Sequence, residues 1–203
     1  AVGYQAGYSN TSGTGNYFGG TQAGYSSVSA SYNTYLGYQA AYASTSTGGS
    51  NNTAVGASAG YNLTGTNVVF IGANAGVANT SGNYNVAVGS SALQANTTAS
   101  ESTAVGYRAL YTNTGAKNCA IGYYAGIFCT TGIKNTFLGN ETGYYLTTGS
   151  GNTFIGYESG QYGGANQITT GSYNTYVGFG TISSANNVTG ELVLSARAAD
   201  GST

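Results

Sequence analysis

The residues with the clearest catalytic potential are two glutamates, Glu141 and Glu158, which stand at the same place in successive copies of a repeated phrase. Two carboxylates about 5 Å apart supply the acid, base and nucleophile of a retaining glycosidase. Two solvated glutamates on a polar edge explain the pair equally well. Because the chain has no histidine, Ser- and Cys-based triads lack a base and most zinc sites lack a ligand. We therefore expect no enzyme, no metal and no cofactor, and keep a glycan depolymerase as an alternative.

Two cysteines, Cys119 and Cys129, fall in one copy of the phrase. Cys129 stands where other copies carry a leucine, Leu63 or Leu146, so we expect both thiols to point inward across one unit. Two interpretations remain open: a disulfide between them, or two buried thiols that pack as small hydrophobic groups. Two cysteines do not make a disulfide scaffold, so they leave the redox compartment undecided.

Tyrosines recur at fixed places after the phrase, and the chain holds 20 of them. Tyr38, Tyr107 and Tyr157 each directly follow the central glycine of a phrase. In one interpretation the ring covers the rim of a structural unit while its hydroxyl meets water. In the other, the rings form platforms for a bacterial surface glycan. We prefer packing, and name these three tyrosines as the candidate glycan contacts.

The composition excludes several classes of partner. Charged residues make up 4% of the chain and the net charge is −1, so nothing steers it toward nucleic acid or an anionic membrane. No apolar run approaches the ~20 residues of a membrane span. Disordered chains are usually charged and poor in aromatics, unlike this one. Abundant Thr, Val, Ile, Tyr and Phe with 35 Gly instead predict strands and tight turns.

The phrase is a short sequence motif, seen for example in NNTAVGASAG at residues 51–60, and it recurs eleven times. Each copy is centred on a glycine that we number zero. The glycines are Gly3, Gly20, Gly37, Gly56, Gly72, Gly89, Gly106, Gly122, Gly139, Gly156 and Gly178. The steps of 16 to 22 residues suit one turn of a β-solenoid. We predict an all-β parallel β-roll of about eleven coils over residues 1–180. Residues 181–203 are expected to be an exit segment, with ELVLS as a closing strand, leading to a further domain. The chain begins inside a phrase, so we expect it to be part of a longer polypeptide.

The columns of the repeat assign faces to each strand. Position −1 carries branched aliphatics, which we predict to form the solenoid core: Val55, Ile71, Val88, Val105, Ile121, Leu138, Ile155 and Val177. Position −2 alternates between alanine and aromatic residues. Since neighbouring strand residues face opposite ways, this column should lie outside its own coil. Position +2 is polar and should face water, and the glycine usual at +4 predicts a positive φ.

Both strand faces avoid charge, which implies burial on both sides. We therefore expect identical chains to pack side by side around a closed symmetry axis. The aromatic members of the −2 column are the predicted axis residues: Tyr35, Phe70, Phe137, Phe154 and Tyr176.

The segments NTAVGASAGY (52–61), NTYLGYQAAY (33–42) and NTFLGNETGYY (135–145) resemble the head repeats of YadA-like trimeric autotransporter adhesins. They resemble still more closely the Tyr- and Gly-rich repeats of bacteriophage tail fibres. The resemblance covers residues 1 to about 180, and implies a homotrimer of left-handed parallel β-rolls. The Val68–Val69 start of one phrase departs from it.

The expected function is that of a structural shaft in a phage tail fibre, located on the virion and holding a receptor-binding tip for host attachment. The alternative is the head of a cellular adhesin on a bacterial surface. The expected partners are the chain itself and a bacterial surface glycan, with no nucleic acid and no membrane insertion. An ice-binding solenoid is a further class, because stacked threonines can order water. The Thr column at −3 is interrupted and is expected to face inward.

Overall fold

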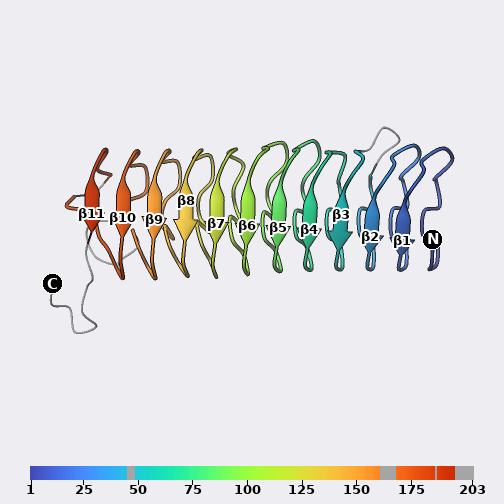
Figure 1. The fold of residues 1–203 in the computed structure, drawn as a ribbon, viewed down its shortest axis with the longest axis horizontal. Helices are drawn as coiled ribbons and strands as arrows, with labels where there is room; N and C mark the ends of the chain where they lie inside the picture. Colours follow the sequence, from blue (N-terminus) through green and yellow to red (C-terminus); the bar gives the residue numbers. More distant parts are fainter. Residues whose placement is uncertain (45–48, 161–167, 186, 195–203) are drawn as a thin grey trace.

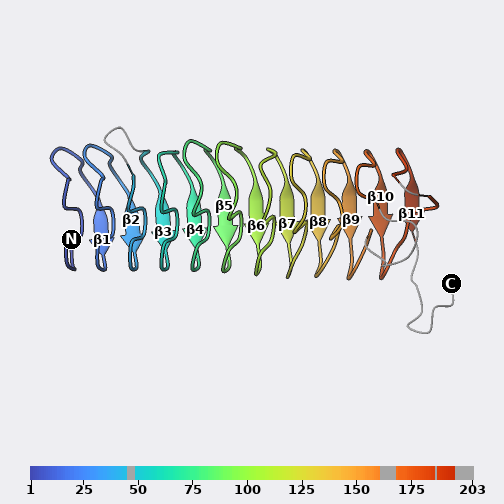
Figure 2. The same cartoon turned by 180° about the vertical axis from the view of Figure 1, so that it is seen from behind.

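The chain forms one rod-shaped β-solenoid, described here from a computed structural model for residues 1–44, 49–160, 168–185 and 187–194. Eleven parallel strands follow one another in sequence order in a single sheet. They stand side by side along the rod, and the chain returns behind the sheet after each strand (Figures 1 and 2). The predicted all-β repeat solenoid is confirmed. The strands are β1 (Tyr17–Gly19), β2 (Thr34–Leu36), β3 (Thr53–Val55), β4 (Val69–Ile71), β5 (Val86–Val88), β6 (Thr103–Val105), β7 (Cys119–Ile121), β8 (Thr136–Leu138), β9 (Thr153–Ile155), β10 (Thr175–Val177) and β11 (Leu192–Leu194).

The strands pair in an exact register set by the phrase. Positions −3, −2 and −1 of one coil lie beside the same positions of the next, as in Phe137 beside Phe154. The two longest steps between phrase glycines contain residues 45–48 and 161–167, which lie outside the described residues. In the exit segment, Leu192–Leu194 of the predicted closing strand form β11, which pairs in parallel with β10 at the end of the sheet.

The interior of each coil is formed by the −2 column, which corrects the predicted faces. Tyr35, Phe70, Phe137, Phe154 and Tyr176, expected on a shared axis, are fully buried within the single chain. The residues expected in the core lie on the opposite face of the same strands, each partly or largely exposed: Val55, Ile71, Val88, Val105, Ile121, Leu138, Ile155 and Val177.

Volume compensation within each coil explains why the −2 column can be interior. Where −2 is a phenylalanine, as in Phe70, position +4 is a glycine, and a Cβ on Gly76 would lie 2.6 Å from the Phe70 ring. Where −2 is alanine, as in Ala87 or Ala104, a buried leucine can occupy +4, as Leu93 does. In these coils the large residue comes from one side or the other. Where both positions are small, as at Ala54 and Gly60, the Phe70 ring of the next coil lies 3.1 Å from a Cβ added to Gly60, so the interior stays filled.

A ladder of asparagine side chains at position −4 joins the coils. The Asn118 Oδ1 accepts from the Asn135 backbone N–H at 2.9 Å, and the Asn135 Oδ1 accepts from the Asn152 N–H at 2.9 Å. The Asn135 Nδ2 donates to the Gly149 carbonyl at 2.9 Å. These side chains are buried, so each bond satisfies a backbone group that has no strand partner. The sequence analysis did not predict this ladder.

Candidate functional site

The outer face of the sheet is an uncharged surface that runs along the described part of the rod. It consists of the −1 column together with the −3 column, whose members are Tyr17, Thr34, Thr53, Val69, Val86, Thr103, Cys119, Thr136, Thr153, Thr175 and Leu192. No strand residue in either column carries a charge. Ile71, Ile121 and Leu138 remain 39%, 41% and 43% exposed. A continuous apolar stripe of this kind marks an interaction surface.

The threonines at −3 face outward on this surface, whereas the sequence predicted that they would face inward. They flank the aliphatic stripe rather than fill the coil. Val69, Val86 and Cys119 interrupt the column in the middle of the sheet. The face is therefore a mixed stripe of threonine and aliphatic side chains.

The two cysteines are both free thiols, so the disulfide interpretation is wrong. The reason is geometric: Cys119 stands on the outer sheet face beside Thr103 and Thr136, whereas Cys129 is fully buried inside the coil. Burial raises the pKa of the Cys129 thiol to about 11 and also raises the pKa of Cys119. Both thiols are therefore protonated near neutral pH, and only Cys119 reaches the surface.

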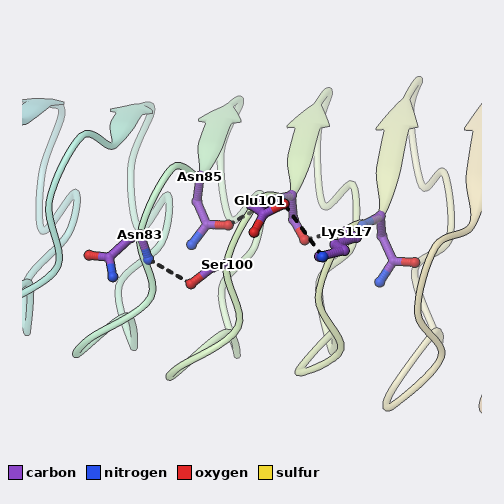
Figure 3. A network of polar contacts seen from close by, with 7 residues as sticks. Asn83, Asn85, Ser100, Glu101 and Lys117 are labelled. Carbon is purple, nitrogen blue, oxygen red and sulfur yellow. Dashed lines mark hydrogen bonds and ion pairs between the residues drawn. The ribbon is translucent and has the colours of Figure 1, made fainter.

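Charged side chains sit at two columns where the backbone is left-handed. Position −5 carries Glu101, Lys117 and Lys134, and position +2 carries Arg108, with φ values between 54° and 64° for these four. Lys117 and Glu101 form an exposed ion pair at 3.7 Å, which contributes little in water. Figure 3 shows this pair among neighbouring polar contacts, one of which is the hydrogen bond that the Asn83 backbone N–H donates to the Ser100 Oγ at 3.0 Å.

Glu141 and Glu158 occupy the +2 column in successive coils, at the polar edge that follows the strands. Their backbone N–H groups donate to the carbonyls of Tyr123 at 2.7 Å and Asn140 at 3.0 Å, which fixes their places on the edge. Among the described residues, no group of three His, Cys, Asp or Glu side chains is placed to hold a metal ion.

Most tyrosines of the +5 column form a packing ladder. Tyr8, Tyr25, Tyr42 and Tyr61 stack face to face with ring centroids 5.0–5.1 Å apart and interplanar angles of 4° to 21°. Each inner ring therefore covers the faces of its neighbours and offers only its edge to a ligand.

The three candidate glycan contacts lie in different surroundings. Tyr38 is 55% exposed. Tyr157 stacks on Phe179 at 5.4 Å and 12°. Tyr107 belongs to a larger group of tilted rings around Arg108.

That group, which we call the aromatic platform, spans three coils. Its ring members are Tyr107, Tyr111, Tyr123, Tyr124, Phe128, Tyr144 and Tyr145. The Arg108 guanidinium carbon lies 5.2 Å from the Tyr107 ring centroid and 5.1 Å from that of Tyr111. Most of the ring pairs in the platform are tilted by 37° to 86°. These rings therefore do not cover one another's faces as the stacked tyrosines of the +5 column do.

The platform is electrically asymmetric. A hydrogen bond between the two phenols raises the pKa of Tyr123 to about 12 and lowers the pKa of Tyr124. The positive charge of Arg108 further lowers the pKa of Tyr124. The Tyr124 oxygen therefore accepts, and Arg108 supplies the positive end of the platform.

No protein-family model, curated protein or solved structure matches this chain. Among the described residues, none belongs to a helix long and apolar enough to cross a membrane. The fold itself defines the class: the chain is an all-β repeat protein, a parallel β-solenoid with one apolar outer sheet face.

Proposed function

We propose that this chain is the shaft of a homotrimeric fibre, and specifically of a bacteriophage tail fibre that holds a receptor-binding tip away from the virion. The observation that carries the proposal is the outer sheet face. Its apolar stripe repeats in every strand that follows β1 and carries no charge, although the same chain exposes charges at two other columns. A rod with one apolar side needs a partner along its whole length.

The partner that fits this stripe is a second copy of the chain. Side chains on the face recur once per coil, at the ~4.8 Å spacing of adjacent strands. A partner that packs against successive rungs must repeat at the same spacing, which another copy of the solenoid does. Chains that associate through one such face close most simply into a cyclic assembly. The resemblance of the phrase to trimeric adhesin and tail-fibre repeats supports three copies.

This arrangement replaces the aromatic axis expected from the sequence with an aliphatic one. Ile71, Ile121 and Leu138 would approach the axis, while the phenylalanines stay inside each chain. Threonines at −3 would flank the axis on each protomer. Eleven strands give a shaft of roughly 50 Å, and further repeats outside residues 1–203 would lengthen it.

Cys119 provides a direct test of the trimer, because it is the outer-face thiol. With copies parallel and in register, three Cys119 side chains lie at one level near the axis, whereas each Cys129 stays inside its coil. We expect a short bis-maleimide to link two chains of the trimer in wild type and Cys129→Ser, but not in Cys119→Ser. Light scattering of the unlinked protein should give three chains.

A monomer in light scattering, or linkage that survives Cys119→Ser, would contradict the shared axis. A monomer that also reshapes growing ice crystals would favour the ice-binding class, since the threonines do face outward.

The location of the fibre separates the phage proposal from its cellular alternative. An antibody raised against residues 1–203 is expected to decorate the tail fibres of particles purified from the source culture in immunogold electron microscopy. Pre-absorbing the antibody with the purified chain is the control. Gold on cell envelopes and none on particles would instead support a cellular trimeric adhesin.

A further inference from the structure

We propose that the aromatic platform on the coils of β6, β7 and β8 is a binding site for a carboxylate-bearing glycan. Arg108 would hold the sugar carboxylate, and the tilted rings around it would stack on the pyranose faces. The site is complete within one chain and lies on residues that follow the strands, so it does not depend on the trimer or on the fibre proposal.

The aromatic platform gathers several partly exposed rings into one group, whereas the more exposed Tyr38 belongs to no such group. Tyr107, Tyr123 and Phe128 are 40%, 43% and 40% exposed, although they belong to one group of rings in contact. Several of those contacts are edge to face, for instance Phe128 with Tyr144 at 86°. Ring faces carry the negative part of the π quadrupole, which attracts the weakly positive C–H groups of a sugar ring.

Arg108 is the one arginine in the part of the chain that the structure describes. Tyr107 and Tyr111 hold its guanidinium in place. Its Nε is buried against the protein, so a carboxylate would have to bind the two terminal nitrogens of the guanidinium. A planar guanidinium that is already oriented loses little entropy when it grips a carboxylate through two parallel hydrogen bonds.

The hydroxyl groups of the platform favour a sugar over an apolar protein surface as its ligand. Six of the seven rings are tyrosines, so nearly every apolar face is paired with a hydroxyl at its rim. The Gln94 Nε2 donates to the Tyr111 hydroxyl at 3.3 Å, and Glu141 adds an acceptor on the third coil. Alternating apolar faces and hydrogen-bonding groups match the amphipathic surface of a pyranose. Arg108 and Glu141 stand two rungs apart in one column, roughly 10 Å, about the length of a disaccharide.

The neighbouring coils offer natural replacements that keep the backbone intact. Position +2 is glutamine in Gln22 and Gln39, with φ values of 59° and 53°, so Arg108→Gln suits the left-handed backbone there. Position +1 is alanine in Ala57, so Tyr107→Ala is equally compatible. Lys117→Gln removes a cation from a different column and serves as the matched control.

The test uses the full chain on an array of oligosaccharides that contain uronic or sialic acids, each beside its methyl ester. We expect wild type and Lys117→Gln to bind acidic members and prefer them to the esters. Arg108→Gln should weaken that binding by about tenfold or more, the usual effect of losing a hydrogen bond to a charged group, and remove the preference. Tyr107→Ala should weaken binding to acids and esters alike.

Failure of wild type to bind any acidic member would overturn the proposal, as would unchanged binding by Arg108→Gln. Equal binding to acids and esters would remove the role assigned to Arg108. Circular dichroism of each variant shows whether a loss comes from the site or from the fold.

Discussion

Phe137→Asp is expected to abolish folding of the solenoid around β8. The Phe137 side chain is fully buried and meets Phe154 edge to face, with ring centroids 5.9 Å apart. Removing a buried phenylalanine costs about 3–5 kcal/mol, and an unpaired carboxylate at the same place adds a desolvation cost of several more. Small domains have only ~5–15 kcal/mol to lose. We expect insoluble protein, or a chain without a cooperative urea transition.

Leu138→Asp is the matched control, because it places the same charge on the next residue of the same strand. Leu138 is 43% exposed on the outer face, so an aspartate there meets water in the single chain. This variant should fold with a wild-type circular dichroism spectrum and fail to form the proposed trimer. The opposite outcome, a folded Phe137→Asp and an unfolded Leu138→Asp, would show that the strand faces have been assigned wrongly. A folded Leu138→Asp that remains trimeric would show that this face is not the axis.

The architecture could be predicted from sequence because the repeat constrains it at every coil. Eleven glycine-centred phrases at nearly constant spacing leave room for one strand and one return per turn. Positive φ values at +4 glycines such as Gly60, Gly126 and Gly143 also follow from the sequence, and the structure confirms them. These features depend on local backbone preferences, which the residue types report directly.

The faces of the strand could not be assigned from hydrophobicity alone, because both sides of it are apolar. Hydrophobicity alone predicts that the uniform aliphatic column at −1 forms the core. It also predicts that the −2 column, which alternates between alanine and aromatic residues, packs between chains. The sequence does hold a signal in the relation between positions −2 and +4: Phe70 occurs with Gly76, and Ala87 with Leu93. Where the two positions compensate each other in volume within one repeat, they share one interior.

The sequence predicts some residues of the candidate sites but not their contacts. The position of Tyr107 in the repeat makes it a candidate glycan contact, but the spacing does not show that its ring meets Arg108 or that neighbouring rings tilt. Tilting arises where successive coils carry adjacent aromatic residues, such as Tyr123 with Tyr124 and Tyr144 with Tyr145, so that the rings cannot all stack in parallel. Two aromatic residues side by side in the sequence of one repeat are therefore the signal for the platform.

Gly122→Ala should divide the solenoid into two parts that unfold separately. Gly122 has a φ of 144°, and an added Cβ would lie 2.2 Å from the Gly139 carbonyl oxygen and 2.5 Å from its carbon. These are backbone atoms of the next coil, so relief requires the two coils to move apart and lengthen the bonds between β7 and β8. Strain at such a φ costs about 1–3 kcal/mol, and overpacking about as much again.

The consequence extends beyond one coil because each repeat contacts only its neighbours. Weakening one interface uncouples the coils before β7 from those after β8, so urea unfolding should change from one transition to two. Gly190→Ala is the control, since Gly190 has a φ of 77° but no atom within 4 Å of an added Cβ. It should cost only the ~1–2 kcal/mol of a left-handed alanine and keep a single transition. If Gly122→Ala unfolds in a single transition at the urea concentration of wild type, the close approach of Gly122 to Gly139 does not couple the coils.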